Sequence, residues 1–178
     1  MAILRFETTA TIFNQFDLAI CRYFNKLSSQ RGIELFFAII SNLGNGKAWY
    51  ALILSLPVIY GEPALFISGK MILAGVLGLI FYKIVKSTTE RLRPYMVDKQ
   101  IRLGTAPMDQ YSFPSGHTLH AASFSNIVLY YLPELVFIVL PFALLVAASR
   151  IILGLHYPTD VLAGAIFGTC FAVMIILL

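Results

Sequence analysis

The stretch Ser-Arg-Ile-Ile-Leu-Gly-Leu-His-Tyr-Pro-Thr-Asp, residues 149–160, connects two apolar segments at 134–150 and 159–178. Each segment is long enough for a helix that crosses a membrane, and the second would reach roughly 30 Å. The connection carries Arg150, His156 and Asp160. Such side chains are costly in lipid unless they gather in a wet pocket. The stretch therefore predicts a helical membrane protein with a polar site at one end of its helices.

The composition of the whole chain agrees with a membrane location. Of the 178 residues, 58% are hydrophobic and only 12% are charged, and the mean hydropathy is +0.80. A soluble domain carries about twice that share of charged residues. We therefore expect a single membrane-embedded domain over residues 1–178. The net charge of +4 does not indicate nucleic-acid binding, because the basic residues form no tract; anionic headgroups and phosphate fit it better.

The remaining segments complete the expected fold. Clear spans are predicted at about 64–85 and 116–131, whereas 33–60 is apolar but interrupted at 42–47 and forms either one kinked span or two short helices. Residues 11–28 place apolar side chains at helical spacing and predict an amphipathic helix, which lies on the membrane surface or packs against the bundle. We expect an all-α integral membrane protein, a bundle of about five to six transmembrane helices with an N-terminal amphipathic interfacial helix in an interfacial arm over residues 1–31.

Two further polar clusters precede residues 149–160, at 86–94 (Lys-Ser-Thr-Thr-Glu-Arg-Leu-Arg-Pro) and 114–117 (Pro-Ser-Gly-His). The tight loop 132–134 makes its two helices antiparallel neighbours. Counting the predicted crossings from there places all three clusters on one side of the membrane. The sequence therefore predicts that they share one site.

The charged residues of these clusters fit phosphate chemistry. Phosphoryl transfer needs positioning and charge neutralisation, which Arg93, Arg150 and Lys86 can supply without a metal. The backbone N–H groups and hydroxyl at Ser115 and Gly116 would lie at a helix N-terminus, which favours anions, and glycine allows a close approach. These five residues are the predicted phosphate-binding set.

The two histidines divide the remaining chemistry. His156 and Asp160 are four residues apart, so that the carboxylate can orient one imidazole nitrogen and leave the other free to attack phosphorus. His117 is then the natural general acid for the leaving oxygen. Because this requires one neutral and one protonated histidine, we predict a bell-shaped pH profile for turnover.

Several residues have simpler interpretations. His120 is interpreted as a packing or polar-network residue, although a metal pair with His117 is an alternative. Arg91 and Arg102 are interpreted as headgroup contacts. Four aromatic residues near the ends of the spans are predicted to mark membrane interfaces: Trp49, Tyr50, Tyr130 and Tyr131. Cys21 and Cys170 have no metal-ligand spacing, and we infer no disulfide between them.

At the three clusters the chain resembles the phosphatidic acid phosphatase type 2 (PAP2) superfamily, which shares its site with vanadium haloperoxidases and some soluble acid phosphatases. The family pattern K-x6-RP, PSGH and SR-x5-H-x3-D occurs complete and in order over 86–160. The resemblance implies that His156 forms a phosphohistidine, that Asp160 orients it and that His117 is the acid. It further implies phosphate binding by Lys86, Arg93, Ser115, Gly116 and Arg150.

Together these observations predict a metal-independent lipid phosphatase without a cofactor. The resemblance implies undecaprenyl diphosphate, phosphatidylglycerol phosphate, phosphatidic acid or lipid A 1-phosphate as substrate, and we favour a polyprenyl diphosphate or a glycerophospholipid. Alternatives are a phosphotransferase, a vanadate-dependent peroxidase, and a non-catalytic lipid binder or transporter. The bilayer and its phosphate lipids are the expected partners, with no obligate protein partner.

The orientation in the membrane rests on two opposed arguments. Lys and Arg are normally in excess in cytoplasmic loops, and the side that carries the three clusters is the basic one, which would place the site in the cytoplasm. These cations have a chemical reason to be there, however. The resemblance implies a bacterial inner-membrane protein with its site facing the periplasm or exterior, and this is the orientation that we expect.

Overall fold

The computed structural model describes residues 15–178, and its regular structure in that range is helical apart from an isolated bridge between Leu92 and Tyr111. A first helix covers residues 15–25. The elements that follow are η1 (Lys26–Ser29), α2 (Arg31–Asn42), η2 (Leu43–Lys47), α3 (Ala48–Tyr60), α4 (Pro63–Thr89), α5 (Pro94–Val97), α6 (Gly116–Tyr131), η3 (Pro133–Leu135), α7 (Val136–Ile152) and α8 (Pro158–Leu177). The clear spans predicted from the sequence agree with α4, α6, α7 and α8 to within a few residues.

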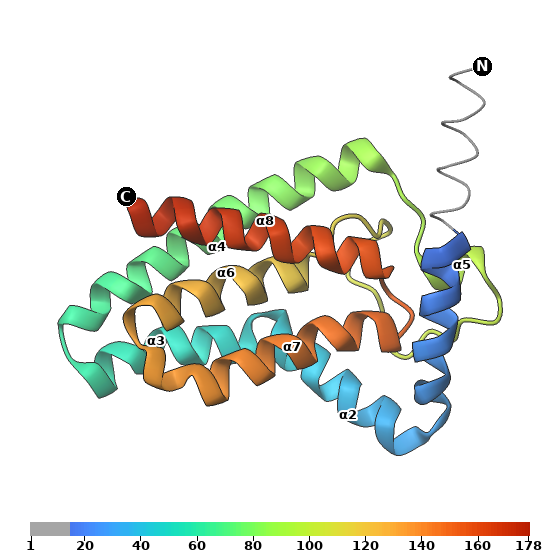
Figure 1. The fold of residues 1–178 in the computed structure, drawn as a ribbon, viewed down its shortest axis with the longest axis horizontal. Coiled ribbons are helices and arrows are strands. Elements are labelled where there is room, and N and C mark those ends of the chain that lie inside the picture. The colour runs from blue at the N-terminus through green and yellow to red at the C-terminus, as the bar shows by residue number, and fades with distance from the viewer. Residues whose placement is uncertain (1–14) are drawn as a thin grey trace.

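The long helices form a bundle with α6 at its centre, packed against α4, α7 and α8. Figure 1 shows them running along one axis, with helix 15–25 lying across the end at which α8 begins. In the described part of the chain, α4, η3 with α7, and α8 are long and apolar enough to cross a membrane. The prediction of an all-α membrane protein is confirmed.

Residues 33–60 form one kinked path rather than an antiparallel pair. The π-helical turn η2 joins α2 to α3, and Asn45 and Gly46 leave helical geometry there, Gly46 with φ +105°. A left-handed φ of this kind suits glycine, which has no Cβ. Beyond the kink, α3 packs against α4, while α2 packs against α7.

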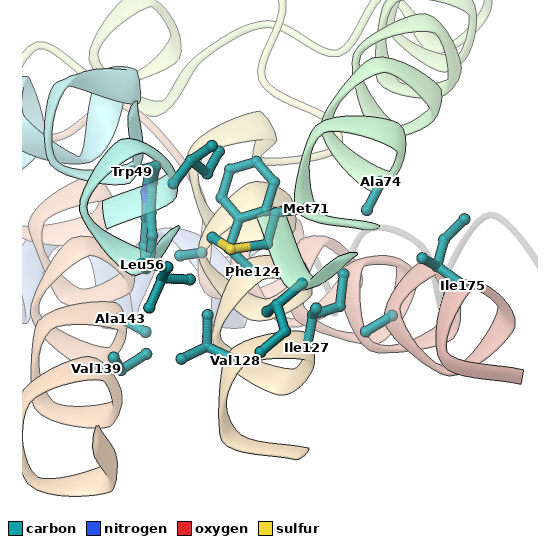
Figure 2. Packing of buried hydrophobic residues seen from close by; sticks show 14 of the residues in the cluster. Trp49, Leu56, Met71, Ala74, Phe124, Ile127, Val128, Val139, Ala143 and Ile175 are labelled. Atoms are coloured by element: carbon teal, nitrogen blue, oxygen red, sulfur yellow. The ribbon is translucent and has the colours of Figure 1, made fainter. Parts of the chain in front are cut away.

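The core of the bundle is apolar and aromatic, and so is much of its outer surface. Trp49, Leu56, Met71 and Phe124 are buried together between α3, α4 and α6 (Figure 2). Trp49 was expected at a membrane interface, and that prediction is wrong, because its ring packs against Phe124 at 5.5 Å between centroids. Large apolar side chains also cover the outside, for example Val58, Phe137 and Ile138, as expected of lipid-facing helices.

Helices α6 and α8 approach so closely that only glycine fits between them. A Cβ atom on Gly164 would lie 2.5 Å from the carbonyl oxygen of Ser115, and one on Gly168 would lie 2.2 Å from that of Leu119. This Gly-x-x-x-Gly spacing is typical of membrane helices whose backbones touch. The contact holds the first turns of α6 and α8 side by side.

The described part of the predicted amphipathic helix (residues 11–14 lie outside the described residues) packs with its polar side inward. Asp17, Cys21 and Asn25 follow at four-residue spacing and are all buried. The Asn25 side chain donates to the carbonyls of Arg102 and Ile152, each at 2.9 Å. Phe16 and Tyr23 stay 65% and 71% exposed, so the apolar side remains available to the membrane surface, as an interfacial helix requires.

Candidate active site

The three polar clusters meet in one cavity of about 600 Å³. Its polar end is lined by side chains from all three: Lys86, Arg93, His117, Arg150 and His156, together with Asp109. The rest of its wall is largely apolar and comes mainly from α3 and α4, with further residues from η2 and α6. The convergence predicted from the sequence is therefore present, with His117 and His156 on the same cavity.

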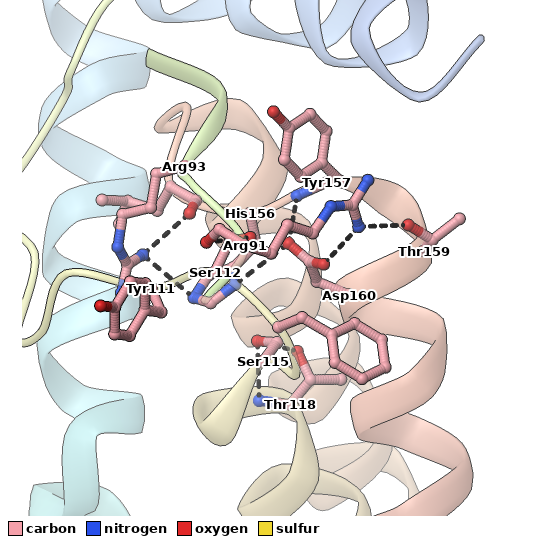
Figure 3. Close-up of polar contacts among 12 residues, drawn as sticks. Arg91, Arg93, Tyr111, Ser112, Ser115, Thr118, His156, Tyr157, Thr159 and Asp160 are labelled. Carbon is pink, nitrogen blue, oxygen red and sulfur yellow. Dashed lines mark hydrogen bonds and ion pairs between the residues drawn. The ribbon is translucent and has the colours of Figure 1, made fainter. Parts of the chain in front are cut away.

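The local fold orients His156 from both sides. Helix α7 ends at Ile152, and the backbone N–H groups of Leu155 and His156 both donate to the carbonyl of Arg150 at 3.0 Å. Helix α8 begins at Pro158, which places Asp160 in its first turn. The imidazole Nδ1 then lies 3.6 Å from Asp160 Oδ2, and Nε2 lies 3.3 Å from Arg93 Nη1 (Figure 3).

His156 is held in the form that a nucleophile needs. Its side chain is buried, and this burial, with the positive charges of Arg150, Arg93 and Lys86, holds its pKa well below the ordinary value, while Asp109 acts in the opposite direction. A neutral imidazole has a free lone pair on one nitrogen. With Nδ1 facing Asp160, the nitrogen available for attack is Nε2, on the cation side.

Two of the three cations already hold a carboxylate. Lys86 Nζ donates to both oxygens of Asp109 at 2.8 Å. Arg93 donates from Nη2 to Asp109 Oδ1 at 2.7 Å and from Nη1 to the carbonyl of Leu155 at 2.8 Å. Burial would raise the pKa of Asp109, but the hydrogen bonds and charges of Lys86 and Arg93 outweigh it and keep the pKa below its usual range. Asp109 is therefore an anion that forms ion pairs with both Lys86 and Arg93.

The third cation, Arg150, differs from Lys86 and Arg93 in its partners. It is 3% exposed, its Nη1 donates to the hydroxyl of Ser41, and its Nε has no hydrogen-bond partner among the described residues. No carboxylate among those residues forms an ion pair with it. A buried charge without an opposite charge is strongly unfavourable. An anion in the cavity beside Arg150 would offset this charge.

The start of α6 contributes in two ways. Gly116 and His117 line the cavity, and a Cβ on Gly116 would lie 3.3 Å from the Tyr82 ring. Ser115 instead caps the helix: its hydroxyl lies 2.9 Å from that of Thr118 and accepts from the Thr118 N–H at 3.5 Å. Its own N–H donates to the carbonyl of Asp160 at 3.1 Å. The Ser115 side chain is buried and is not among the residues that line the cavity. Phosphate binding by Ser115 stays a prediction.

The headgroup interpretation of Arg91 is wrong. Its guanidinium donates to Asp160 Oδ1 at 2.6 Å, to Thr159 Oγ1 at 2.8 Å and to Asp17 Oδ2 at 2.7 Å. Arg102, in contrast, is exposed. Sequence analysis also missed Asp109, Asp17 and Ser41. None of these residues stands at a recognisable spacing from the motifs, so only the folded structure reveals their roles.

His120 packs as the simpler interpretation predicted. Its ring stacks on Phe124 with centroids 5.5 Å apart and meets the Tyr82 ring edge-on at 5.9 Å. Over residues 15–178 no group of three or more His, Cys, Asp or Glu side chains is placed to hold a metal ion.

Comparison with curated proteins identifies relatives of the chain. The undecaprenyl-diphosphatase of Sulfolobus acidocaldarius is 27% identical over 148 residues, which are 82% of this chain and 69% of the relative. The phosphatidylglycerophosphatase B of Bacillus subtilis is 34% identical over 100 residues. That match covers 48% of this chain and 45% of the relative, so the chain spans less than half of the length of this relative.

Solved structures agree with the fold. The crystal structure of Aquifex aeolicus LpxE has a TM-score of 0.79 at 25% identity, covering 90% of this chain and 94% of that one. A transmembrane PAP2-type phosphatidylglycerolphosphate phosphatase from Bacillus subtilis has a TM-score of 0.71 at 25% identity, with 92% and 84% covered. The PAP2 superfamily model matches residues 66–178, which include all three polar clusters. The chain therefore belongs to the PAP2 superfamily.

Proposed function

We propose that this protein is a lipid phosphatase that hydrolyses a phosphomonoester or diphosphate of a membrane lipid through a phosphohistidine, without a metal ion. The observation that carries this proposal is that Arg150, buried and without an ion pair among residues 15–178, lines the same cavity as His156, whose pKa is held well below its ordinary value by burial and the nearby cations. Family membership supports the reaction class, because the relatives named above are phosphatases of lipid phosphates and diphosphates.

In the first step, His156 Nε2 attacks phosphorus and forms a P–N bond while the bond to the lipid oxygen breaks. His117 gives its proton to that leaving oxygen. In the second step, water attacks the phosphohistidine, His117 takes a proton from the water, and the P–N bond breaks to release phosphate. Asp160 stabilises the positive charge that develops on the His156 ring during attack.

The three cations neutralise the phosphoryl oxygens. Arg150 and Arg93 offer planar, bidentate donors, while Lys86 acts as a point charge. Arg93 is well placed for this, because its Nη1 lies 3.3 Å from the attacking nitrogen of His156. An oxygen on phosphorus would thus meet a donor at the start of the reaction, and the charge that grows in the transition state would be offset.

The apolar wall of the cavity supports a lipid as substrate. From the cations at its polar end, the lining continues along α3 and α4 through Trp49, Ile53, Met71, Ile72 and Leu79. A free sugar phosphate would leave this surface wet, whereas an acyl or prenyl chain would bury it. We favour a polyprenyl diphosphate or a glycerophospholipid phosphate. The similarity to LpxE over 90% of the chain keeps a lipid A 1-phosphatase as the alternative.

We also propose that the site faces the periplasm or exterior of a bacterial inner membrane. The rule that Lys and Arg are in excess in cytoplasmic loops would place this basic side in the cytoplasm. Lys86, Arg91 and Arg93, however, form ion pairs within the protein, and this gives them a structural reason to be there. Labelling of an introduced Gln100→Cys by an impermeant maleimide in intact cells tests this orientation. Labelling only after the membrane is opened would place the site in the cytoplasm.

The function is tested by phosphate release from purified lipids in detergent with EDTA present, over a panel of the four candidate substrates. We expect turnover of at least one lipid and its complete loss in His156→Ala, while thermal unfolding shows that the variant stays folded. Enzyme quenched in alkaline denaturant, in which the P–N bond of phosphohistidine survives, should carry phosphate on the peptide that contains His156. Unchanged turnover of His156→Ala would overturn the mechanism, and a phosphorylated acceptor in place of free phosphate would indicate a phosphotransferase.

A further inference from the structure

Asp160, which orients His156, is itself held by a chain of charges that leads to the N-terminal helix. Its Oδ2 accepts from the Tyr157 N–H at 2.9 Å and faces His156 Nδ1 at 3.6 Å. Its Oδ1 accepts from Arg91 at 2.6 Å. Asp17 lies on the other side of Arg91, 2.7 Å from the second guanidinium nitrogen. The order of contacts is Asp17, Arg91, Asp160, His156 (Figure 3 shows the last three).

We propose that Arg91 and Asp17 are positioning residues for the proposed reaction: Arg91 fixes the Asp160 carboxylate in register with His156 and offsets its charge, and Asp17 holds Arg91 in place. This inference rests on the proposed function and adds two residues that the family pattern quoted above does not specify, since Arg91 stands at a variable position within K-x6-RP and Asp17 lies outside it.

The geometry explains why the orientation of Asp160 depends on Arg91. A carboxylate that rotates about its Cβ–Cγ bond exchanges its two oxygens, and here each oxygen has a different partner. Rotation would break the contact of Oδ1 with Arg91 and that of Oδ2 with the Tyr157 N–H. The nitrogens of a guanidinium lie in one plane, so one arginine can bridge two carboxylates in a fixed geometry. A lysine in its place has a single, rotatable ammonium group and would not hold the two carboxylates in the same planar geometry.

Arg91 is in turn fixed from several directions. Its guanidinium carbon lies 3.9 Å from the centroid of the Tyr157 ring, a cation–π contact. The Ser112 N–H donates to its backbone carbonyl at 2.8 Å. Asp17 also accepts from the Thr159 backbone N–H at 3.2 Å and from its hydroxyl. Because Thr159 lies in the first turn of α8, Asp17 sits where a helix attracts a negative charge.

The charge of Arg91 matters as well as its shape. Side chains with charge or a titratable group approach His156 from every neighbouring element: Lys86 of α4, Arg93 and Asp109 before α6, His117 of α6, Arg150 of α7, Asp160 of α8 and Cys21 of helix 15–25. Among these, Asp160 is the anion that faces Nδ1. Without Arg91 its charge would be uncompensated and would favour imidazolium, which cannot attack phosphorus.

Three substitutions separate geometry from charge. Arg91→Lys keeps the charge but loses the bridge, so kcat should fall about tenfold to hundredfold while the acid limb of the kcat/KM profile stays in place. Arg91→Gln loses both, so kcat should fall similarly and the acid limb should move up by about one pH unit. Asp17→Asn removes a negative charge beside Arg91, so that more of the positive charge of Arg91 acts on Asp160 and His156. The acid limb should therefore move to lower pH, by less than in Arg91→Gln.

Matched controls and a second readout make the test decisive. Arg102→Gln removes an exposed arginine of the same segment and should leave kcat and the acid limb unchanged. The chain has three histidines, so nitrogen NMR of labelled histidine can follow the titration of His156 in the free protein, with its signal assigned by His156→Gln. The His156 pKa should rise in Arg91→Gln and not in Arg91→Lys.

The outcomes distinguish the two proposals. If the wild-type protein releases no phosphate from any lipid, the proposed function fails, yet the NMR titration still tests the link from Arg91 to His156. If the protein is active but Arg91→Gln keeps the wild-type kcat, acid limb and His156 pKa, the positioning proposal is wrong. Loss of activity in Arg91→Gln and Arg91→Lys alike, with no pH shift in either, would reduce Arg91 to a purely structural role.

Discussion

The carboxylate of Asp109 accepts hydrogen bonds from Lys86 and Arg93. If these cations bind phosphate, as the proposed function requires, Asp109 competes with it, and its removal should strengthen phosphate binding. In Asp109→Asn the side chain keeps its size but loses its charge. The two cations then no longer have to exchange one anion for another when a ligand arrives. Inorganic phosphate, orthovanadate and the lipid phosphate should all bind more tightly than to the wild-type protein.

The size of the effect follows from the exposure of the ion pairs. Asp109 forms one pair with Lys86 and one with Arg93, and its side chain is 38% exposed, so solvent screens both. Partly exposed pairs contribute about 0.2–1 kcal/mol each, so their loss should lower the inhibition constant of phosphate by about twofold to thirtyfold.

The assay is competitive inhibition of lipid phosphate hydrolysis by orthovanadate and by inorganic phosphate, with EDTA present for the phosphate series. Orthovanadate is informative because its five-coordinate form resembles the transition state. Asp98→Asn is the matched control, since Asp98 pairs with Arg22 outside the cavity and its loss should leave inhibition unchanged. An unchanged or raised inhibition constant in Asp109→Asn would show that Asp109 holds Lys86 and Arg93 in place for phosphate and does not compete with it.

Three further predictions concern the acid, the pH range and the bundle. His117→Gln should slow lipid phosphate hydrolysis far more than that of an aryl phosphate, whose leaving oxygen needs little protonation; equal losses would argue against a general acid. Because burial and nearby cations lower the pKa of His156, the acid limb of kcat/KM should lie below 6.5, and a limb above that value contradicts a neutral His156. Gly168→Ala should reduce the free energy of unfolding by about 1–3 kcal/mol, as measured by thermal unfolding. Gly69→Ala is the control and should not, because a Cβ at Gly69 meets no atom within 4 Å. Equal effects of the two substitutions would refute the close α6–α8 contact.

The sequence predicted those features that depend on local spacing. Apolar runs gave the helices, and the motif spacing correctly anticipated that His156 and Asp160 would meet across the first turn of α8. Partners that are distant in sequence could not be found in this way. Arg91 reaches Asp160 over 69 residues and Asp17 over 74, and no periodic pattern links such positions.

One local expectation failed for a reason that the fold makes clear. Trp49 follows Lys47, a pairing typical of a membrane interface, but it lies beyond the kink at Asn45 and Gly46 and packs into the core. Here tertiary position overrides what the residue type alone suggests. Ser115 has the residue type of a phosphate ligand and lies at the N-cap of α6, where its hydroxyl contacts that of Thr118; phosphate binding by Ser115 stays a prediction.

The glycine contact between α6 and α8 has a consequence for how the site can adapt. The two backbones touch at Gly164 and Gly168, and the Ser115 N–H is bonded to the Asp160 carbonyl, so His117 and the carboxylate behind His156 belong to one stiff unit. Lys86, Arg93 and Asp109 lie on the end of α4 and the long connection to α6. Headgroups of different size would therefore be accommodated by movement of Lys86 and Arg93, while His117 and His156 keep a constant separation.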